Sequence, residues 1–391
     1  MERQTQIEIG RRLLDAVRDG KPDMMDQTFQ VDVAHYTSID QAADEREILF
    51  RDFPVMVAAS CELPGPGDFV TSEATGVPSL VVRNKNGAAR AFINVCRHRG
   101  SRVETAPSGS KKQAFTCSYH GWTYDTDGNL KVIPQEFGFE GFDKSCNGLR
   151  ELPVVEKHGF IWVRHTPGEG FDLSDYTSGI EQDLDAYGLD TWHHFKTTEI
   201  RCRMNWKLVM DTFFEGYHIG KLHKATIAHI FNDMATAFDA FGRNHRLVLG
   251  RRKIEELRNL PESEWDVLPC TAVTYCLFPN TIIVYQADHV EIFRVFPGER
   301  PDESFAILSF LTPEAATTEK AKNYWQKNLD LLIETVKGED FPAGETIQAG
   351  IPSGAQEHFT WGRYELALAH YHKGIKEVLG RPQLLPKKAA E

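Results

Sequence analysis

The chain has 391 residues, 26% of them charged and 41% hydrophobic, which is ordinary for a soluble globular protein with room for two domains. Its net charge of −12 argues against nucleic acid and anionic membranes as partners, because an acidic surface repels both. No stretch approaches the roughly eighteen apolar residues of a membrane span, and the first residues lack the apolar core of a signal peptide, so we expect a cytoplasmic protein.

The N-terminal part, residues 1–45, is expected to be a helical segment. Four apolar residues recur on one stripe at helical spacing: Ile9, Leu13, Leu14 and Val17. Gly20 should end this helix, and a second helix is expected from Asp40 to Phe50. Neither helix contains residues that suggest chemistry.

From about Arg51 the pattern changes to short strands separated by turn residues. The expected strands and hairpin segments are Leu80–Arg83, Arg90–Ile93, Tyr124–Leu130 and Phe160–Val163. Asn84–Gly87 and Asp127-Gly128 supply the turns, and Phe160–Val163 is expected to be the last strand. We therefore expect a small all-β domain over residues 46–165.

The most specific motif lies inside this domain. It reads Cys96-Arg97-His98, then eighteen residues, then Cys117-Ser118-Tyr119-His120. Each loop can give one thiolate and one imidazole, so that two thiolates bind one iron and two imidazoles bind the other, as in a Rieske [2Fe–2S] cluster. A Cys2His2 zinc site is the alternative, but it pairs Cys with Cys and His with His at other spacings. We therefore predict a cluster held by Cys96, His98, Cys117 and His120.

A second motif lies in the mixed helix and strand region of residues 166–391. His218 and His223 follow two carboxylates and lie five residues apart, which can place both imidazoles on roughly one side of a helix that distorts or ends near Gly220. An oxygen ligand from elsewhere would complete the 2-His-1-carboxylate site typical of non-haem Fe(II) that activates dioxygen. Taken alone, such a pair is more often surface or core histidine.

Together, the two motifs resemble the large (alpha) subunit of the Rieske non-haem iron aromatic ring-hydroxylating oxygenases, over about Asp44 to Tyr371. The resemblance implies an α+β fold, in which a small all-β Rieske [2Fe–2S] domain precedes a larger α/β catalytic domain. In the latter, helices flank an antiparallel sheet in a helix-grip (START-like) arrangement. The implied parts are residues 1–45, packed on the catalytic domain, the Rieske domain 46–165 and the Fe(II) domain 166–391. His218 and His223 match the iron histidines.

For the third iron ligand, the resemblance points to acidic residues after a helix expected from Glu319 to Gly338. In the family, an acidic residue ahead of a segment similar to Ile347–Ile351 completes the ligand set. Asp340 is our assignment, and Glu339 is the alternative.

Glu215 stands where many family members have an Asp that links a cluster histidine of one subunit to an iron histidine of the next. The resemblance implies the same bridge in a head-to-tail homotrimer, with or without a small β subunit. The longer side chain resembles members that demethylate or hydroxylate non-aromatic amines. Asp211 stands where the family often has Glu, and we expect it to form local hydrogen bonds at the catalytic centre.

By analogy with the family, six apolar residues should line the substrate pocket: Met210, Phe214, Ile227, Phe231, Phe238 and Ile282. The segment Ile227–Phe241 has helix-like apolar spacing, and two strands are expected around Pro279-Asn280. An apolar wall fits an aromatic or other hydrophobic substrate. Four arginines could pair with a substrate carboxylate, although such a stretch is more often a solvated surface: Arg243, Arg246, Arg251 and Arg252.

The resemblance implies a terminal oxygenase that uses dioxygen and electrons from a separate reductase, directly or through a ferredoxin. Its reaction would be mono- or cis-dihydroxylation of an aromatic or hydrophobic small molecule. Oxidative N- or O-demethylation, for instance of a quaternary amine, is the alternative. A Rieske electron carrier is disfavoured because it needs no second set of metal ligands. The chain contains no Gly-x-Gly-x-x-Gly stretch, so nothing indicates a nicotinamide or flavin site of its own.

Overall fold

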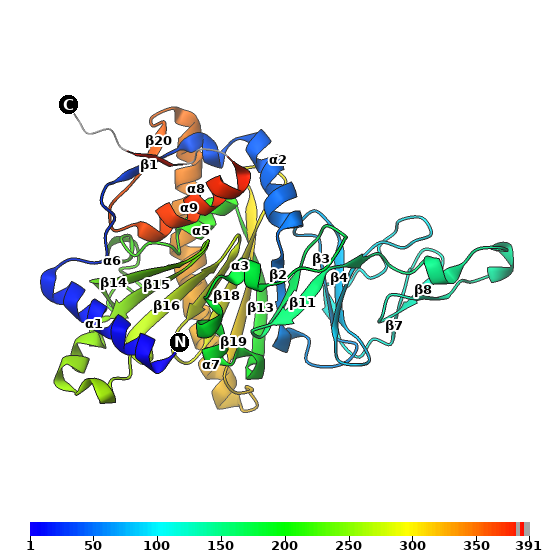
Figure 1. Cartoon of the computed structure of the whole chain (residues 1–391), viewed down its shortest axis with the longest axis horizontal. Helices are drawn as coiled ribbons and strands as arrows, with labels where there is room; N and C mark the ends of the chain where they lie inside the picture. The colour runs from blue at the N-terminus through cyan, green and yellow to red at the C-terminus, as the bar shows by residue number, and fades with distance from the viewer. Residues whose placement is uncertain (381–383, 387–391) are drawn as a thin grey trace. The chain divides into compact units, whose positions relative to one another are not determined.

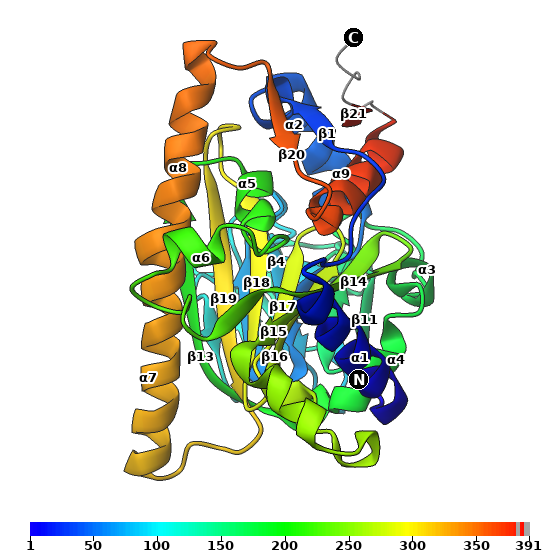
Figure 2. The same ribbon diagram turned by 90° about the vertical axis from the view of Figure 1, so that its left-hand side faces the viewer.

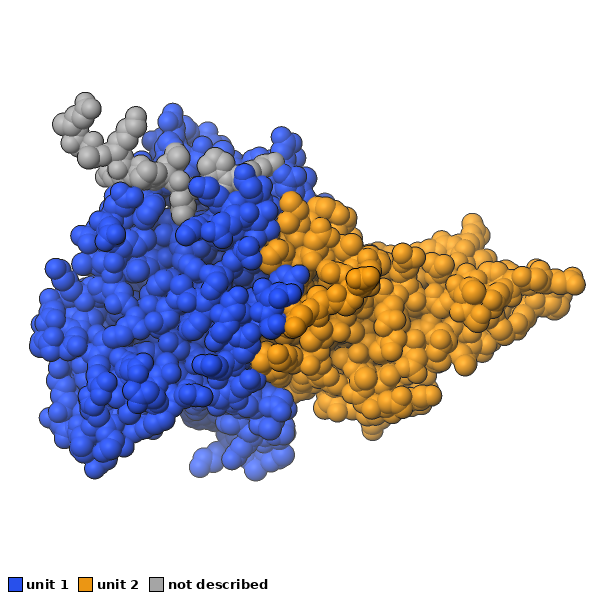
Figure 3. All heavy atoms as spheres, viewed as in Figure 1, with its two compact units in different colours: residues 1–45, 174–391 blue, residues 46–173 orange. Residues whose placement is uncertain are grey.

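The structure, a computed structural model, describes residues 1–380 and the backbone of 384–386. The chain divides into two compact units (Figure 3). One unit is the continuous segment Arg46–Leu173, and the other combines Met1–Glu45 with Ser174–Glu391. The N-terminal segment is therefore grouped with the C-terminal part of the chain.

The unit Arg46–Leu173 consists mainly of short antiparallel strands. Its largest sheet has five strands in the order β10-β5-β4-β3-β6, with bounds Glu151–Leu152, Ala89–Ile93, Ser79–Arg83, Phe69–Ser72 and Ser108–Gly109. β4 and β5 form the predicted hairpin, in which Val81 pairs with Ala91. The backbone N–H of Gly87 donates to the carbonyl of Asn84 at 3.0 Å and closes its turn.

Two three-stranded sheets complete this unit. The first is β11-β12-β2, with bounds Val154–Lys157, Phe160–Val163 and Val55–Ala59. The second is β7-β8-β9, with bounds Ala114–Thr116, Thr123–Asp125 and Leu130–Val132. The turn predicted at Asp127-Gly128 joins β8 to β9, and β12 is the predicted last strand. Cys96 and Cys117 are buried in a core cluster with Trp122 and Tyr124, which anchors both cysteines of the first motif.

The other unit is built on a seven-stranded antiparallel sheet in the order β13-β19-β18-β17-β16-β15-β14. The bounds, in that order, are His193–Cys202, Ser304–Thr312, Val290–Pro297, Thr281–Tyr285, Thr271–Leu277, Asn244–Arg251 and Phe231–Phe241. The predicted strand pair around Pro279-Asn280 is the β16–β17 hairpin. Figure 2 shows α7 (Glu319–Thr335) and α8 (Phe341–Gly350) stacked as one long rod beside this sheet.

The helix predicted to end at Gly338 does not end there. α7 continues through a π-helical turn, Val336–Asp340, directly into α8. Glycine lowers helix propensity by only about 1 kcal/mol, and burial of the apolar side chain of Val336 in the same turn offsets this. Such turns insert an extra residue into the helical path and are frequent at functional sites.

The two helices predicted in the N-terminal segment are α1 (Arg3–Asp19) and α2 (Ile39–Glu47). α1 buries Ile9 and Leu13 and ends at Gly20, whose φ of 62° suits glycine. α2 passes into a π-helical turn, Ile48–Asp52. The remaining helices of four or more residues, outside the 3₁₀ and π-helical turns, are α3 (Ser174–Thr177), α4 (Glu181–Tyr187), α5 (Trp206–Asp211), α6 (Ile219–Leu222) and α9 (Leu366–Leu379).

A small sheet joins the beginning and the end of the described chain. β1 (Phe29–Asp32) lies between β20 (His358–Trp361; Figure 1) and β21 (Leu384–Pro386; Figure 2) and pairs antiparallel with both. None of the helices within the described residues has the length and apolarity that a bilayer crossing requires.

The segment with helix-like apolar spacing after His223 contains a long strand. Phe231, Phe238 and Phe241 lie in β14, which pairs with β15 around a register shift between Phe231 and Thr236. The shift interrupts the alternation of the strand, so that apolar residues three or four positions apart imitate a helical period.

Candidate functional site

The first Cys/His loop follows β5. The backbone N–H of Cys96 donates to the carbonyl of Ser101 at 2.8 Å, and that of Gly100 donates to the carbonyl of Cys96 at 3.0 Å. The loop therefore closes on itself, with the Cys96 thiol in the core and His98 closer to the surface.

The second Cys/His loop is the tip between β7 and β8. The N–H of Cys117 donates to the carbonyl of Trp122, and the N–H of Gly121 donates to the carbonyl of Cys117, both at 2.9 Å. Gly121 has a φ of 76°, and a Cβ there would lie 2.9 Å from Cγ of Pro134. Both the backbone conformation and the close approach therefore require glycine.

The two loops bring their imidazoles together. Nδ1 of His98 lies 3.0 Å from Nδ1 of His120, and the ring of His98 stacks on Trp122 with centroids 4.9 Å apart. The hydroxyl of Tyr124 lies 3.3 Å from Sγ of Cys96, and burial raises the pKa of the Cys96 thiol. Adjacent imidazole nitrogens beside buried thiols are the donor types of a Rieske cluster, whose iron favours the thiolate form.

His218 and His223 flank the single helical turn α6, and both lie outside its helical residues. Gly216 and Gly220 lower the helix propensity of this stretch, and His223 has a non-helical ψ of 31°. The two side chains converge from the ends of α6, with ring centroids 5.0 Å apart.

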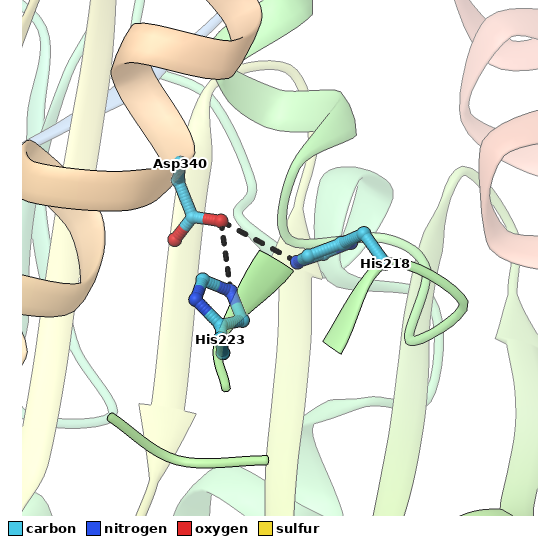
Figure 4. Close-up of side chains that lie close together, drawn as sticks. All are labelled: His218, His223 and Asp340. Carbon is cyan, nitrogen blue, oxygen red and sulfur yellow. Dashed lines mark ion pairs between the residues drawn. The ribbon is translucent and has the colours of Figure 1, made fainter. Parts of the chain in front are cut away.

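Asp340 faces both histidines from the π-helical turn (Figure 4). Its Oδ1 lies 3.0 Å from Nε2 of His223 and 3.4 Å from Nε2 of His218. One ligand atom from each residue lies within 4.8 Å of the other two. Oδ1 is buried without a hydrogen-bond partner, because its contacts with the imidazoles lack hydrogen-bond direction. An unsatisfied carboxylate oxygen that faces two imidazole nitrogens fits a divalent metal ion.

Two further carboxylates lie behind the histidines. Glu215 pairs with Nδ1 of His218, and its Oε2 also accepts from the backbone N–H of His218 at 3.2 Å. Oε2 of Glu339 lies 2.7 Å from Nδ1 of His223, on the ring edge opposite Asp340. A carboxylate at Nδ1 selects the tautomer that leaves Nε2 free to bind a metal.

The site concentrates negative charge around the two imidazoles. Burial opposes the charged form of His218, but the negative charges of Asp340 and Glu215 beside the ring outweigh it and raise its pKa to about 10. Burial would raise the pKa of Asp340, but contacts with His218 and His223 lower it overall. These charges suit a bound cation.

Asp211 belongs to a neighbouring buried network. Its Oδ2 accepts from the hydroxyl of Tyr36 at 2.8 Å, and its Oδ1 lies 2.8 Å from Nε2 of His372. Nδ1 of His372 lies 2.8 Å from Nε2 of His35. The network ties α5 and α9 to the N-terminal segment.

A buried ion pair lies beside the same network. Nζ of Lys207 lies 2.6 Å from Oε1 of Glu45, and each side chain is 1% exposed. The indole N–H of Trp206 donates to the other oxygen of Glu45 at 2.8 Å. Both charges are therefore partnered away from water.

A cavity of about 330 Å³ includes the metal-site residues in its wall. It lies between the sheet and the rod formed by α7 and the π-helical turn. Much of its apolar lining comes from Phe213, Ile227, Ile230, Phe231, Leu249 and Leu332. Its polar lining away from the metal-site residues includes Arg251, Gln286, Asp288, His289, Glu291 and Tyr324.

Two of the six residues expected to line the pocket, Ile227 and Phe231, line this cavity, and the other four do not: Met210, Phe214, Phe238 and Ile282. Phe214 instead packs its ring on His245 and Tyr371. Ile282 is paired with Phe293, on which the ring of Phe213 packs with a centroid distance of 4.6 Å. Phe213 thus takes a place on the cavity wall that we had assigned to its neighbour.

Sequence reasoning missed the charged part of the cavity. Nδ1 of His289 lies 2.7 Å from Asp288 and Nε2 lies 3.2 Å from Glu291, while Tyr324 donates to Asp288 at 2.5 Å. Burial opposes the charged form of His289, but these hydrogen bonds raise its pKa to about 9. The sequence did contain a hint of this group. His289 and Glu291 are two positions apart at the beginning of a strand, and side chains at that spacing point to the same face.

The four candidate arginines have different environments. Arg246 is buried in ion pairs with Asp183 and Asp239, and Arg252 is exposed. Arg243 does not line the cavity. Arg251 does line it, beside the charged group of Asp288, His289 and Glu291.

Both parts of the chain match known protein families. Two family models match, the Rieske [2Fe–2S] domain over residues 53–143 and the ring hydroxylating alpha subunit catalytic domain over residues 189–381. The chain is 33% identical to the glycine betaine monooxygenase oxygenase subunit of Chromohalobacter salexigens, over 92% of this chain and 88% of that protein. It is 34% identical to the large oxygenase component of the naphthalene 1,2-dioxygenase system of Pseudomonas aeruginosa, over 47% of this chain and 42% of that protein.

A solved structure shows the same fold. It is that of a quaternary ammonium Rieske monooxygenase in complex with an inhibitor, with a TM-score of 0.77 at 22% identity, covering 92% of this chain and 97% of that one. The α+β fold, with a Rieske domain and a catalytic domain, is thereby confirmed. The relatives are monooxygenases and dioxygenases, so both predicted kinds of oxygenation occur among them.

The matched catalytic domain rules against a simple electron carrier and confirms an oxidoreductase that works on small molecules with electron-transfer partners. The chain therefore belongs to the Rieske ring-hydroxylating oxygenases, as a terminal oxygenase component with a [2Fe–2S] cluster and a non-haem iron centre.

Proposed function

We propose that His218, His223 and Asp340 hold the mononuclear Fe(II) of this oxygenase. The observation that carries the proposal is the buried, unsatisfied Oδ1 of Asp340, which faces Nε2 of both histidines. Two imidazoles and one carboxylate leave positions open on an iron ion for dioxygen. Glu339, the alternative ligand, is engaged with Nδ1 of His223 and acts as an orienting residue.

Cys96, His98, Cys117 and His120 hold the Rieske cluster in this proposal. Support comes from the two closed loops and the 3.0 Å approach of the imidazole Nδ1 atoms. When bound, the two metal centres supply single electrons and a site for dioxygen, which together allow oxygen insertion into an unreactive substrate bond.

The protein's own residues orient and enclose this chemistry. Glu215 and Glu339 accept hydrogen bonds from the Nδ1 edges of His218 and His223, which would leave both Nε2 atoms available to hold the iron. The cavity holds the substrate beside these residues, and its apolar wall displaces water from the reacting part of the molecule.

Electrons reach this chain from a separate reductase, directly or through a ferredoxin. We infer that three copies form a head-to-tail ring, since heterologous contacts of this kind close into cyclic symmetry. Glu215 then links His218 to a cluster histidine of the neighbouring copy. Its half-buried side chain, already bound to His218, supports this role.

Monooxygenation is the reaction that we favour over cis-dihydroxylation. Support comes from the glycine betaine monooxygenase subunit, which matches this chain along 92% of its length. Oxygen insertion into a C–H bond next to an amine nitrogen leads to demethylation, and insertion elsewhere leads to a stable alcohol.

The iron assignment is tested with the His218→Ala variant. We expect wild-type protein to contain roughly three irons and two acid-labile sulfides per chain, and the variant to contain roughly two of each with an unaltered cluster spectrum. The exposed His229, replaced in the same way, should leave all three irons in place. Retention of the third iron by His218→Ala would contradict the assignment.

A further inference from the structure

Arg251 is a cation in the cavity wall without a carboxylate partner. Its Nη2 donates to the carbonyl and to Oε1 of Gln286, at 3.3 and 2.9 Å, and both acceptors are uncharged. Its Nε is buried and has no hydrogen-bond partner. Within residues 1–380, no Asp or Glu lies within ion-pair distance of it. Arg246, only five positions earlier, pairs with two aspartates.

The acids nearest to Arg251 are already engaged. Asp288 and Glu291 both bind His289, which is positively charged below a pKa of about 9, and Asp288 also accepts from Tyr324. Burial lowers the pKa of Arg251, and the more distant attraction of Asp288 and Glu291 offsets this only in part. Arg251 is half-buried with its Nε buried, and a guanidinium in such a position would gain from a carboxylate or other anion bound in the cavity.

The surroundings of Arg251 suit an amphipathic molecule. Arg251 lies at the end of β15, opposite Phe231 in the β14–β15 pair and two positions after Leu249 on the same face. Tyr324, which holds Asp288, precedes Asp340 by sixteen residues on one helical rod, or roughly 24 Å along its axis. The charged residues and the metal-site residues therefore lie at different places along the rod, and the wall of the same cavity also contains the apolar side chains of Phe231 and Leu249.

We propose that Arg251 binds a carboxylate of the substrate, and that the enzyme acts on a small carboxylic acid with an apolar or weakly polar body. The planar guanidinium can donate two parallel hydrogen bonds to a carboxylate, and its buried Nε has no hydrogen-bond partner within the described chain. The body of the acid then extends along Phe231 and Leu249 toward His218, His223 and Asp340. Which atom of the acid is oxidised depends on the proposed iron site and so rests on the proposed function. Binding of the carboxylate by Arg251 does not depend on it.

The test compares acids with their uncharged amides. Binding to the holoenzyme is measured by calorimetry for three pairs: hexanoate and hexanamide, phenylacetate and phenylacetamide, and 4-phenylbutyrate and 4-phenylbutyramide. Wild-type protein should prefer the acid of at least one pair, and Arg251→Gln should weaken acid binding roughly ten- to hundredfold while leaving amide binding unchanged. Arg251→Lys keeps the positive charge but loses the paired donors of the guanidinium, so its affinity for the acid should lie between those of the wild type and Arg251→Gln. The exposed neighbour, replaced as Arg252→Gln, is the matched control and should bind as wild type does.

Two outcomes would overturn the inference. The first is that no acid binds more tightly than its amide to the wild type. The second is that Arg251→Gln weakens acid and amide equally, which would make Arg251 a structural counter-charge for Asp288 and Glu291. Iron and sulfide are measured on the same samples. Acid-selective binding to a protein that takes up no third iron even after ferrous iron is added would overturn the proposed function and leave the carboxylate site intact.

Discussion

Oδ1 of Asp340 lies 3.0 Å from Nε2 of His223. The preceding residue, Glu339, contacts the same ring from its other edge, 2.7 Å from Nδ1. Two adjacent residues of one π-helical turn therefore hold opposite edges of one imidazole. The turn makes this possible, because its wider winding lets consecutive carboxylates reach around the ring.

Replacing Glu339 should weaken iron binding without abolishing it. In Glu339→Gln, the amide oxygen can still accept from Nδ1 of His223, but the carboxylate charge is lost, so the apparent iron affinity should fall roughly 10- to 100-fold. Iron titration of the apo-protein measures this. Glu334→Gln, on the exposed side of α7, should titrate as wild type. A Glu339→Gln protein with wild-type affinity would show that this carboxylate is dispensable.

Replacing Glu215 should slow electron transfer more than it affects metal content. Glu215→Gln removes the charge that pairs with Nδ1 of His218 and that we assign to the link with the neighbouring cluster. We expect at least a tenfold slower oxidation of the pre-reduced cluster in a single turnover, with both metals retained. A normal single-turnover rate at full metal loading would remove Glu215 from the electron path.

The hydroxyl of Tyr124 should raise the reduction potential of the cluster. It lies 3.3 Å from Sγ of Cys96, and hydrogen bonds to the sulfur ligands stabilise the reduced state. Tyr124→Phe is therefore expected to lower the potential, as measured by a redox titration of the visible spectrum. Thr123→Val, in the same strand, removes a hydroxyl that bonds to Thr116 and Gly121, and it should leave the potential near the wild-type value.

Each charge of the buried Glu45–Lys207 pair should be needed to neutralise the other, so that removing only one of them destabilises the fold. Lys207→Met leaves Glu45 buried without its counter-ion, and the free energy of unfolding should fall by roughly 3–5 kcal/mol. Adding Glu45→Gln should recover part of this loss. Lys322→Met on the exposed face of α7, where Lys322 pairs with Glu319, should change stability by less than about 1 kcal/mol. The free energies of unfolding of the three variants are measured by denaturant titration. Equal losses of stability in Lys207→Met and Lys322→Met would contradict this account.

The charged His289 should make stability dependent on pH. Its pKa is raised to about 9, so its contribution is fully present below about pH 6.5 and is lost as the pH rises through about 9. The loss is on the order of 3 kcal/mol at most. His289→Gln should lack this component, so the difference in unfolding free energy between wild type and variant should shrink from pH 6 to pH 9.5. A constant difference would mean that His289 is neutral.

The sequence was most informative where ligands are close along the chain. Cys96 and His98, like Cys117 and His120, are separated by one or two residues, so local loop geometry alone limits what they can bind. Asp340 lies over a hundred residues after His223, and its assignment needed the family resemblance. The orienting role of Glu339 depends on a π-helical turn that residue patterns do not signal. The charged cavity wall arises from β15, β17, β18 and α7 together, and only their packing reveals it.

The small sheet of β1, β20 and β21 affects how the protein is made. β1 leaves the ribosome early, but its partner β20 is synthesised about three hundred residues later, which takes roughly fifteen to sixty seconds at ordinary elongation rates. The whole of Arg46–Leu173 is synthesised in that interval and is free to fold first. During synthesis, the N-terminal strand must stay unpaired, or bound by a chaperone, until the last part of the chain emerges.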